Sequence, residues 1–135
     1  LGNRSLLADP RGKIKKLDID KLKERTEEWR PYAPAILSEY YDEYFIGPAS
    51  EYMQFTAKHK TEKLPLVSAA DWSARVQLVE KDCESILREV LELWYKETGC
   101  PVLLNTSLNR KGMPIVDNMY DYKNYIEWSR LNDIS

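Results

Sequence analysis

The stretch CESILREVLELWYKETGCPVLLNTSLN, which runs from Cys83 to Asn109, decides the expected fold. Apolar residues recur every three or four positions in its first part, which predicts a helix over Cys83–Thr98 that ends at Gly99. After a proline, the all-apolar segment Val102–Leu104 is typical of a strand buried on both faces of a helix-covered sheet. We therefore predict an α/β domain. The apolar stripe of the helix consists of Cys83, Ile86, Leu87, Val90, Leu91 and Trp94.

Short hydrogen-bonding side chains follow the predicted strand, namely Asn105, Thr106, Ser107 and Asn109. Ligands of open α/β sheets bind beyond the carboxyl ends of strands, where the segment from Asn105 to Gly112 is expected. Backbone amides can hold an anion there, and Gly112 permits a positive φ. A turn whose side chains satisfy its own backbone explains such a segment equally well, so both interpretations stay open.

Three further helices are predicted from spacing and capping residues. A short charged helix capped by Asp18 or Asp20 is expected to run through Trp29. Helical spacing covers Ala35–Phe45, and a tyrosine-rich helix covers Tyr120–Leu131.

The remaining segments favour extended structure. Alternation predicts strands over Tyr52–Ala57 and Ala74–Val79, and the second of these places Arg75, Gln77 and Val79 on one face. The opening stretch to Asp20 is expected to be a strand or loop with a basic turn, and Pro114–Val116 to be extended.

The composition is that of one globular domain, with 43% hydrophobic and 31% charged residues in 135. A net charge of −2 argues against whole-surface attraction to nucleic acid, although local anion sites remain compatible with it. No apolar run approaches the about 20 residues of a membrane-spanning helix, and the first residues do not show a charged n-region followed by an apolar h-region. Cys83 and Cys100 lack C-x-x-C spacing, which favours packing roles in a reducing, cytoplasmic setting.

Arginines occur in four separate segments, at Arg4, Arg11, Arg30 and Arg75. Arg30 lies in the apolar stretch WRPYAPAI, so it must pair with a carboxylate or face a ligand anion, because an unpaired buried charge is costly. Arg75 raises the same question inside a predicted strand, where Asp71 is a candidate partner or a weak candidate ligand for Mg²⁺.

Arginines that converge with Lys23 near the Ser/Asn segment would suit a phosphate-bearing substrate, because guanidinium groups bind phosphate bidentately. Catalysis at such a site would be electrostatic, often with magnesium. His59 stands between two lysines in an expected surface hairpin, which argues against a catalytic or metal role. No zinc pattern, P-loop, Rossmann fingerprint or nucleophile elbow occurs, and the tyrosines at helical spacing favour core or interface positions over base stacking.

Five ordered blocks of the chain resemble the C-terminal domain of the NodU/CmcH-type carbamoyltransferases, the family that includes the tobramycin carbamoyltransferase. The blocks are LGNRSLLADPR, WRPYAPAIL, SEYMQF, DWSARVQLV and TGCPVLLNTSLNRKGMPIV. They are distributed in order from Leu1 to Val116. The order of the blocks and their matching arginines carry the resemblance.

This resemblance implies a YrdC-like α/β fold, a twisted mixed sheet with flanking helices in a single domain over residues 1–135. It implies binding of ATP and carbamoyl phosphate, with Mg²⁺, to form carbamoyl-adenylate. A preceding metal-binding domain, where Fe²⁺ is expected, would pass the carbamoyl group to an acceptor hydroxyl. The first residue is Leu, so we expect the chain to be a fragment that lacks that domain. A homodimer is compatible with this interpretation.

The resemblance implies that basic side chains neutralise phosphates and that polar ones hold the carbamoyl or phosphate groups. The implied substrate-binding residues are Arg4, Lys23, Arg25, Arg30, Arg75, Asn105, Ser107 and Asn109. Lys23 and Arg25 fit the family pattern K-x-R-E-x-[FW]-R-P only with one residue inserted before Trp29.

The chain departs from the family pattern at two further positions. Ala69 replaces the usual histidine before the D-G-S-A-R motif, and Trp72 replaces its glycine. A noncatalytic nucleotide- or RNA-binding module with the same fold is the alternative, and a purely structural domain is a third interpretation.

Overall fold

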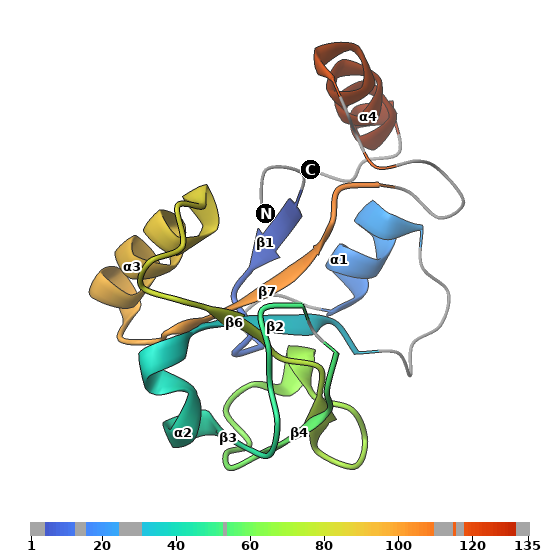
Figure 1. Ribbon diagram of the computed structural model, residues 1–135. Helices are drawn as coiled ribbons and strands as arrows, with labels where there is room; N and C mark the ends of the chain where they lie inside the picture. Colours follow the sequence, from blue (N-terminus) through green and yellow to red (C-terminus); the bar gives the residue numbers. More distant parts are fainter. Residues whose placement is uncertain are drawn as a thin grey trace.

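The computed structural model describes residues 5–12, 16–24, 31–52, 54–109, 115 and 118–131, and it has the predicted α/β class (Figure 1). A four-stranded sheet and a three-stranded sheet are flanked by helices. The strands are β1 (Ser5–Ala8), β2 (Ala33–Leu37), β3 (Phe45–Ile46), β4 (Ala57–His59), β5 (Ser73–Ala74), β6 (Gln77–Val79) and β7 (Val102–Ser107). The helices are α1 (Lys16–Lys23), α2 (Tyr41–Tyr44), α3 (Ile86–Thr98) and α4 (Met119–Leu131), with 3₁₀ turns η1 (Ser38–Tyr40) and η2 (Pro65–Val67).

The four-stranded sheet has the order β1-β7-β2-β6 (Figure 1). β1 and β2 are antiparallel to β7, and β6 is parallel to β2. The register pairs Ser5 with Ser107 and Ala33 with Asn105. It follows that β1, β2 and β6 all begin at the edge of the sheet where β7 ends.

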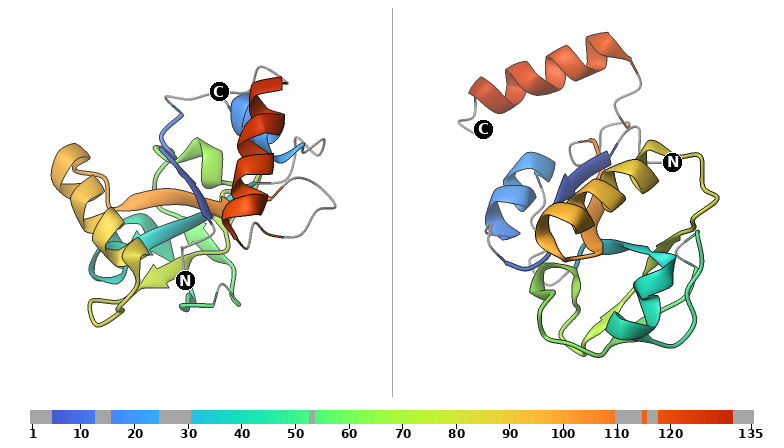
Figure 2. Two further views of the ribbon diagram at one scale, coloured as in Figure 1. Left: turned by 90° about the horizontal axis from the view of Figure 1, so that it is seen from above. Right: turned by 90° about the vertical axis from the view of Figure 1, so that its left-hand side faces the viewer.

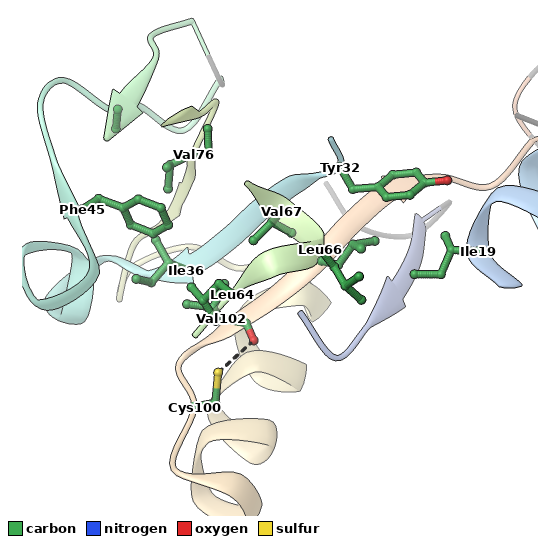
Figure 3. Packing of buried hydrophobic residues seen from close by; sticks show 13 residues of the cluster. Ile19, Tyr32, Ile36, Phe45, Leu64, Leu66, Val67, Val76, Cys100 and Val102 are labelled. Atoms are coloured by element: carbon green, nitrogen blue, oxygen red, sulfur yellow. Dashed lines mark hydrogen bonds between the residues drawn. The ribbon is translucent and has the colours of Figure 1, made fainter. Parts of the chain in front are cut away.

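Each face of this sheet is covered by a different part of the chain. On one face, Leu87 and Leu91 of α3 pack with apolar residues of β2, β6 and β7. On the other face, Ile19 of α1 and Leu66 of η2 belong to a larger cluster that includes Val102 (Figure 3). Val102, Leu103 and Leu104 are all buried, which confirms the predicted strand with two covered faces.

The α3 helix is set by its sequence. Ser85 is the N-cap, and its Oγ accepts a hydrogen bond from the Leu87 amide at 3.2 Å. Gly99 ends the helix with a φ of 71°, in the left-handed region that glycine adopts without strain. The prediction of a helix before the buried strand is therefore confirmed, although α3 begins at Ile86 and not at Cys83, because Ser85 supplies the cap.

Long-range pairing overrides the helical spacing of Ala35–Phe45. Ala35–Leu37 belongs to β2, between β7 and β6, and only Ser38–Tyr44 is helical. The prediction of a helix was wrong there because apolar residues of a strand buried on both faces mimic a helical stripe.

Other predicted boundaries also change. α1 begins before Asp18 and ends at Lys23, and Asp20 accepts a hydrogen bond from the Tyr32 hydroxyl at 2.6 Å instead of capping the helix. The strand predicted over Tyr52–Ala57 is wrong, since pairing starts only at Ala57. The strand predicted over Ala74–Val79 is split at Arg75 into β5 and β6.

The predictions for the two ends of the chain fare better. β1 confirms a strand in the opening stretch, and α4 confirms the tyrosine-rich helix. α4 lies beside α1, where the Tyr125 hydroxyl donates to the Leu22 carbonyl at 2.9 Å (Figure 2). The extended segment predicted over Pro114–Val116 lies outside the described residues except for Ile115. Among the described residues, no helix is long and apolar enough to span a membrane.

Candidate functional site

Lys23, Ser107 and Asn109 meet at the carboxyl end of β7. The Lys23 Nζ donates to Ser107 Oγ at 3.0 Å, to Asn109 Oδ1 at 2.6 Å and also to the Ser107 carbonyl. Ser107 Oγ in turn donates to Asn109 Oδ1 at 2.5 Å. Lys23 is buried, so its ammonium group depends on these oxygen atoms in place of water.

The position of Lys23 follows from how α1 is anchored. Ile19 lies in the core, one helical turn before Lys23, and Asp20 is held by Tyr32 just before β2. The last turn of α1 therefore faces the end of β7, although Lys23 and Ser107 are 84 residues apart in the chain. Basic residues in this turn also suit the negative end of the helix dipole.

Asn105 takes part in a second polar contact, with a residue that the sequence analysis did not select. The Asn105 Nδ2 donates to the Gln77 Oε1 at 2.8 Å. Gln77 is the first residue of β6 and is 5% exposed. Its position in a strand facing inward was visible in the alternation of residues 74–79, and a buried glutamine needs a polar partner.

Asn105 and Ser107 are strand residues, which corrects the expectation of a loop from Asn105 onward. β7 continues through Ser107 because β1 pairs with it from Ala8 to Ser5. The polar side chains thus stand on a paired strand, whose backbone is more rigid than that of a loop.

Three predicted arginines, Arg4, Arg25 and Arg30, lie outside the described residues. Arg75 is described, and it is exposed between β5 and β6, which corrects the expectation of an inward-facing strand residue. Arg11 pairs with Asp9 at 2.9 Å and lies over the Trp94 ring, beyond the end of β1 that is remote from Ser107. It is a structural ion pair.

Asp71 does not act as the partner of Arg75. Its carboxylate accepts from Ser73 Oγ at 2.5 Å and from Lys58 Nζ at 3.1 Å, and these hydrogen bonds, that of Ser73 foremost, lower the pKa of Asp71 to about 2. No group of three or more His, Cys, Asp or Glu side chains in the described part of the chain could hold a metal ion. Asp71 is therefore engaged by Lys58 and Ser73 in this structure, and its assignment as a weak ligand for Mg²⁺ stays a prediction.

His59 lies in β4 and is half-buried, which corrects the expectation of a surface hairpin. Its ring packs edge-on against Phe45, with ring centroids 4.7 Å apart, and against Trp72 at 6.2 Å. Burial lowers the pKa of His59 below its usual range. Trp72 has a φ of 58°, the left-handed region that favours glycine, which explains why the family pattern has a glycine at this position.

Comparison with known proteins decides the family of the chain. A model of the family described as Carbamoyltransferase C-terminus matches residues 1–134. The chain belongs to this family. The resemblance to the NodU/CmcH-type carbamoyltransferases is thereby confirmed.

Proteins similar to this chain include nodulation proteins and an O-carbamoyltransferase. Nodulation protein NolNO of Sinorhizobium fredii is 39% identical over 128 residues, which cover 90% of this chain and 19% of that protein. The 3'-hydroxymethylcephem-O-carbamoyltransferase of Amycolatopsis lactamdurans is 33% identical over 138 residues, covering 99% of this chain and 26% of that protein. Nodulation protein U of Rhizobium tropici is also 33% identical over 138 residues, which cover 99% of this chain and 23% of that protein. The chain thus spans about a fifth to a quarter of the length of these relatives.

Proposed function

We propose that this chain is the activation domain of an O-carbamoyltransferase, which binds ATP and carbamoyl phosphate at the carboxyl end of β7. The observation that carries the proposal is the meeting of Lys23, Ser107 and Asn109 at this edge of the sheet. Membership of the Carbamoyltransferase C-terminus family supports the choice of reaction. The name of the Amycolatopsis relative supports a hydroxyl as the final acceptor.

The sheet topology supports a phosphate site at the same edge. β1, β2 and β6 begin there, and α1 ends there. In the sequence, Arg4 directly precedes β1, Arg25 lies two residues after Lys23, and Arg30 precedes β2 by three residues. Arg75 stands two residues before β6. Guanidinium groups at these four sequence positions would offset the charge of a triphosphate and of carbamoyl phosphate if the fold directs them to this edge.

The proposed reaction balances in two steps. Carbamoyl phosphate and water give carbamate and inorganic phosphate. A carbamate oxygen then bonds to the α-phosphorus of ATP, the bond to the β-phosphate oxygen breaks, and pyrophosphate leaves. The basic residues stabilise the charge on the reacting phosphates, and the polar residues of β7 orient the small substrate.

The first test is titration of the chain with ATP and carbamoyl phosphate, followed by carbamoyl-phosphate-dependent exchange of labelled pyrophosphate into ATP. We expect Lys23→Met to weaken the binding of carbamoyl phosphate by about 10- to 100-fold, the effect of losing a charge-assisted hydrogen bond. Lys21→Met is the matched control, since Lys21 is exposed on the same helix. Unchanged affinity in the Lys23 variant, or no binding of either compound by the parent chain, would overturn the proposal.

A further inference from the structure

The amide groups of Gln77 and Asn105 meet across an intervening strand. β6 and β7 lie on either side of β2, so their backbones are about 10 Å apart by the usual strand spacing. On β2, the residues in register with Asn105 and Gln77 are Ala33 and Ala35. The methyl side chains leave room for the hydrogen bond of 2.8 Å between the two amides.

Each amide keeps one further polar atom, the Oδ1 of Asn105 and the Nε2 of Gln77. Neither atom has a hydrogen bond within the described ranges of the chain. No fully enclosed side-chain nitrogen or oxygen there lacks a hydrogen-bond partner, so neither atom is completely shut off from solvent, although Gln77 as a whole is only 5% exposed. Because Asn105 Nδ2 donates to Gln77 Oε1, the pair offers Asn105 Oδ1 as an acceptor and Gln77 Nε2 as a donor to a further group.

We propose that this amide pair recognises the carbamoyl group, an inference that rests on the proposed function and deepens it. A carbamoyl group carries an NH₂ donor and a carbonyl acceptor on one carbon. Asn105 Oδ1 accepts from the NH₂ group, and Gln77 Nε2 donates to the carbonyl oxygen. Gln77 is therefore both a substrate contact and the positioning residue that keeps Asn105 Oδ1 available.

The position of the pair relative to Lys23 fits a small substrate with two different ends. Asn105 and Ser107 are two residues apart on one strand, which places their side chains on the same face about 7 Å apart. Lys23 contacts Ser107, so the cationic end of the site lies next to the amide pair. Carbamoyl phosphate likewise has a phosphate group next to an amide group, so its phosphate would lie near Lys23 and its amide near the Asn105–Gln77 pair.

Selectivity between carbamoyl phosphate and acetyl phosphate tests the inference, because acetyl phosphate has a methyl group in place of NH₂. We expect the parent chain to bind carbamoyl phosphate about tenfold more tightly, the effect of leaving Asn105 Oδ1 without a donor. Gln77→Met removes the donor and releases the Asn105 amide, so this ratio should fall to about twofold or less. Affinity for inorganic phosphate should stay unchanged, whereas general damage to the fold would lower all three affinities. Gln54→Met, at an exposed glutamine, is the matched control.

A second variant and a ligand-free measurement keep the inference testable if Gln77→Met fails to fold. Ala33→Val should lower the same ratio by filling the space between the amides. In NMR spectra of the parent chain, the Asn105 side-chain amide should exchange slowly with solvent, and rapid exchange would refute the hydrogen bond. If the parent binds carbamoyl phosphate without preferring it to acetyl phosphate, this inference fails while the proposed function stands. If it binds neither carbamoyl phosphate nor ATP, both fail.

Discussion

Replacing Arg88 with methionine should lower the free energy of unfolding by about 3 kcal/mol. The Arg88 side chain is 7% exposed, and it donates to Glu39 at 2.9 and 2.6 Å, to Glu92 at 2.7 Å and to the Val79 carbonyl at 2.8 Å. Methionine keeps the packing of the stem on α3 but removes all four hydrogen bonds.

The magnitude follows from which partners can return to water. The Val79 carbonyl belongs to a buried residue, so the loss of its guanidinium donor costs about 1–3 kcal/mol. The Glu39 side chain is 25% exposed and regains part of its hydration, so the loss of its ion pair with Arg88 should cost about 1 kcal/mol. The Glu92 side chain is 54% exposed and stays hydrated, so the loss of its hydrogen bond with Arg88 adds little to the cost in stability.

Urea unfolding followed by tryptophan fluorescence measures this effect as a lower midpoint with an unchanged slope. Glu39→Gln should cost only about 1 kcal/mol, because Arg88 keeps its contacts with Glu92 and Val79. Lys96→Met, at an exposed position of α3, is the control and should change stability by less than about 0.5 kcal/mol. If Arg88→Met costs no more than Glu39→Gln, the buried carbonyl does not depend on the guanidinium group and the reasoning is refuted.

Three further predictions concern other parts of the molecule. In thermal unfolding, Trp72→Gly should be about 1 kcal/mol more stable than Trp72→Ala. Both variants lose the indole ring, but only glycine removes the backbone strain of the positive φ at this position. Equal stabilities of the two variants would contradict this explanation. Burial lowers the pKa of His59, so the unfolded chain binds the proton more readily; stability should fall as the pH drops from about 7 through the folded pKa, and His59→Gln should flatten this slope in melting curves recorded against pH. Burial also raises the pKa of the Cys100 thiol, so a thiol reagent should modify Cys83 first in the native chain, and equal rates would show that Cys100 is exposed.

The sequence by itself determined the elements whose signals are local. The apolar stripe and terminal glycine of α3, and the apolar run of β7, depend on neighbours within a few residues, so their positions in the chain were predictable. The ordered blocks likewise identified the family and the candidate residues of β7, because they are linear patterns. Residues 35–37 show the limit of local signals, since the same apolar residues fit a helix and a doubly buried strand.

Only the tertiary structure decided which side chains share the edge of the sheet. Lys23 reaches Ser107 across 84 residues, and Asn105 reaches Gln77 across 28 residues and over an intervening strand. These contacts depend on strand order and register, which are set by how the two faces of the sheet are covered, and spacing along the chain carries no record of them. The residue types of the candidate site could therefore be selected from the sequence, whereas the pairing of its amides was decided by the packing of the sheet and the helices that cover it.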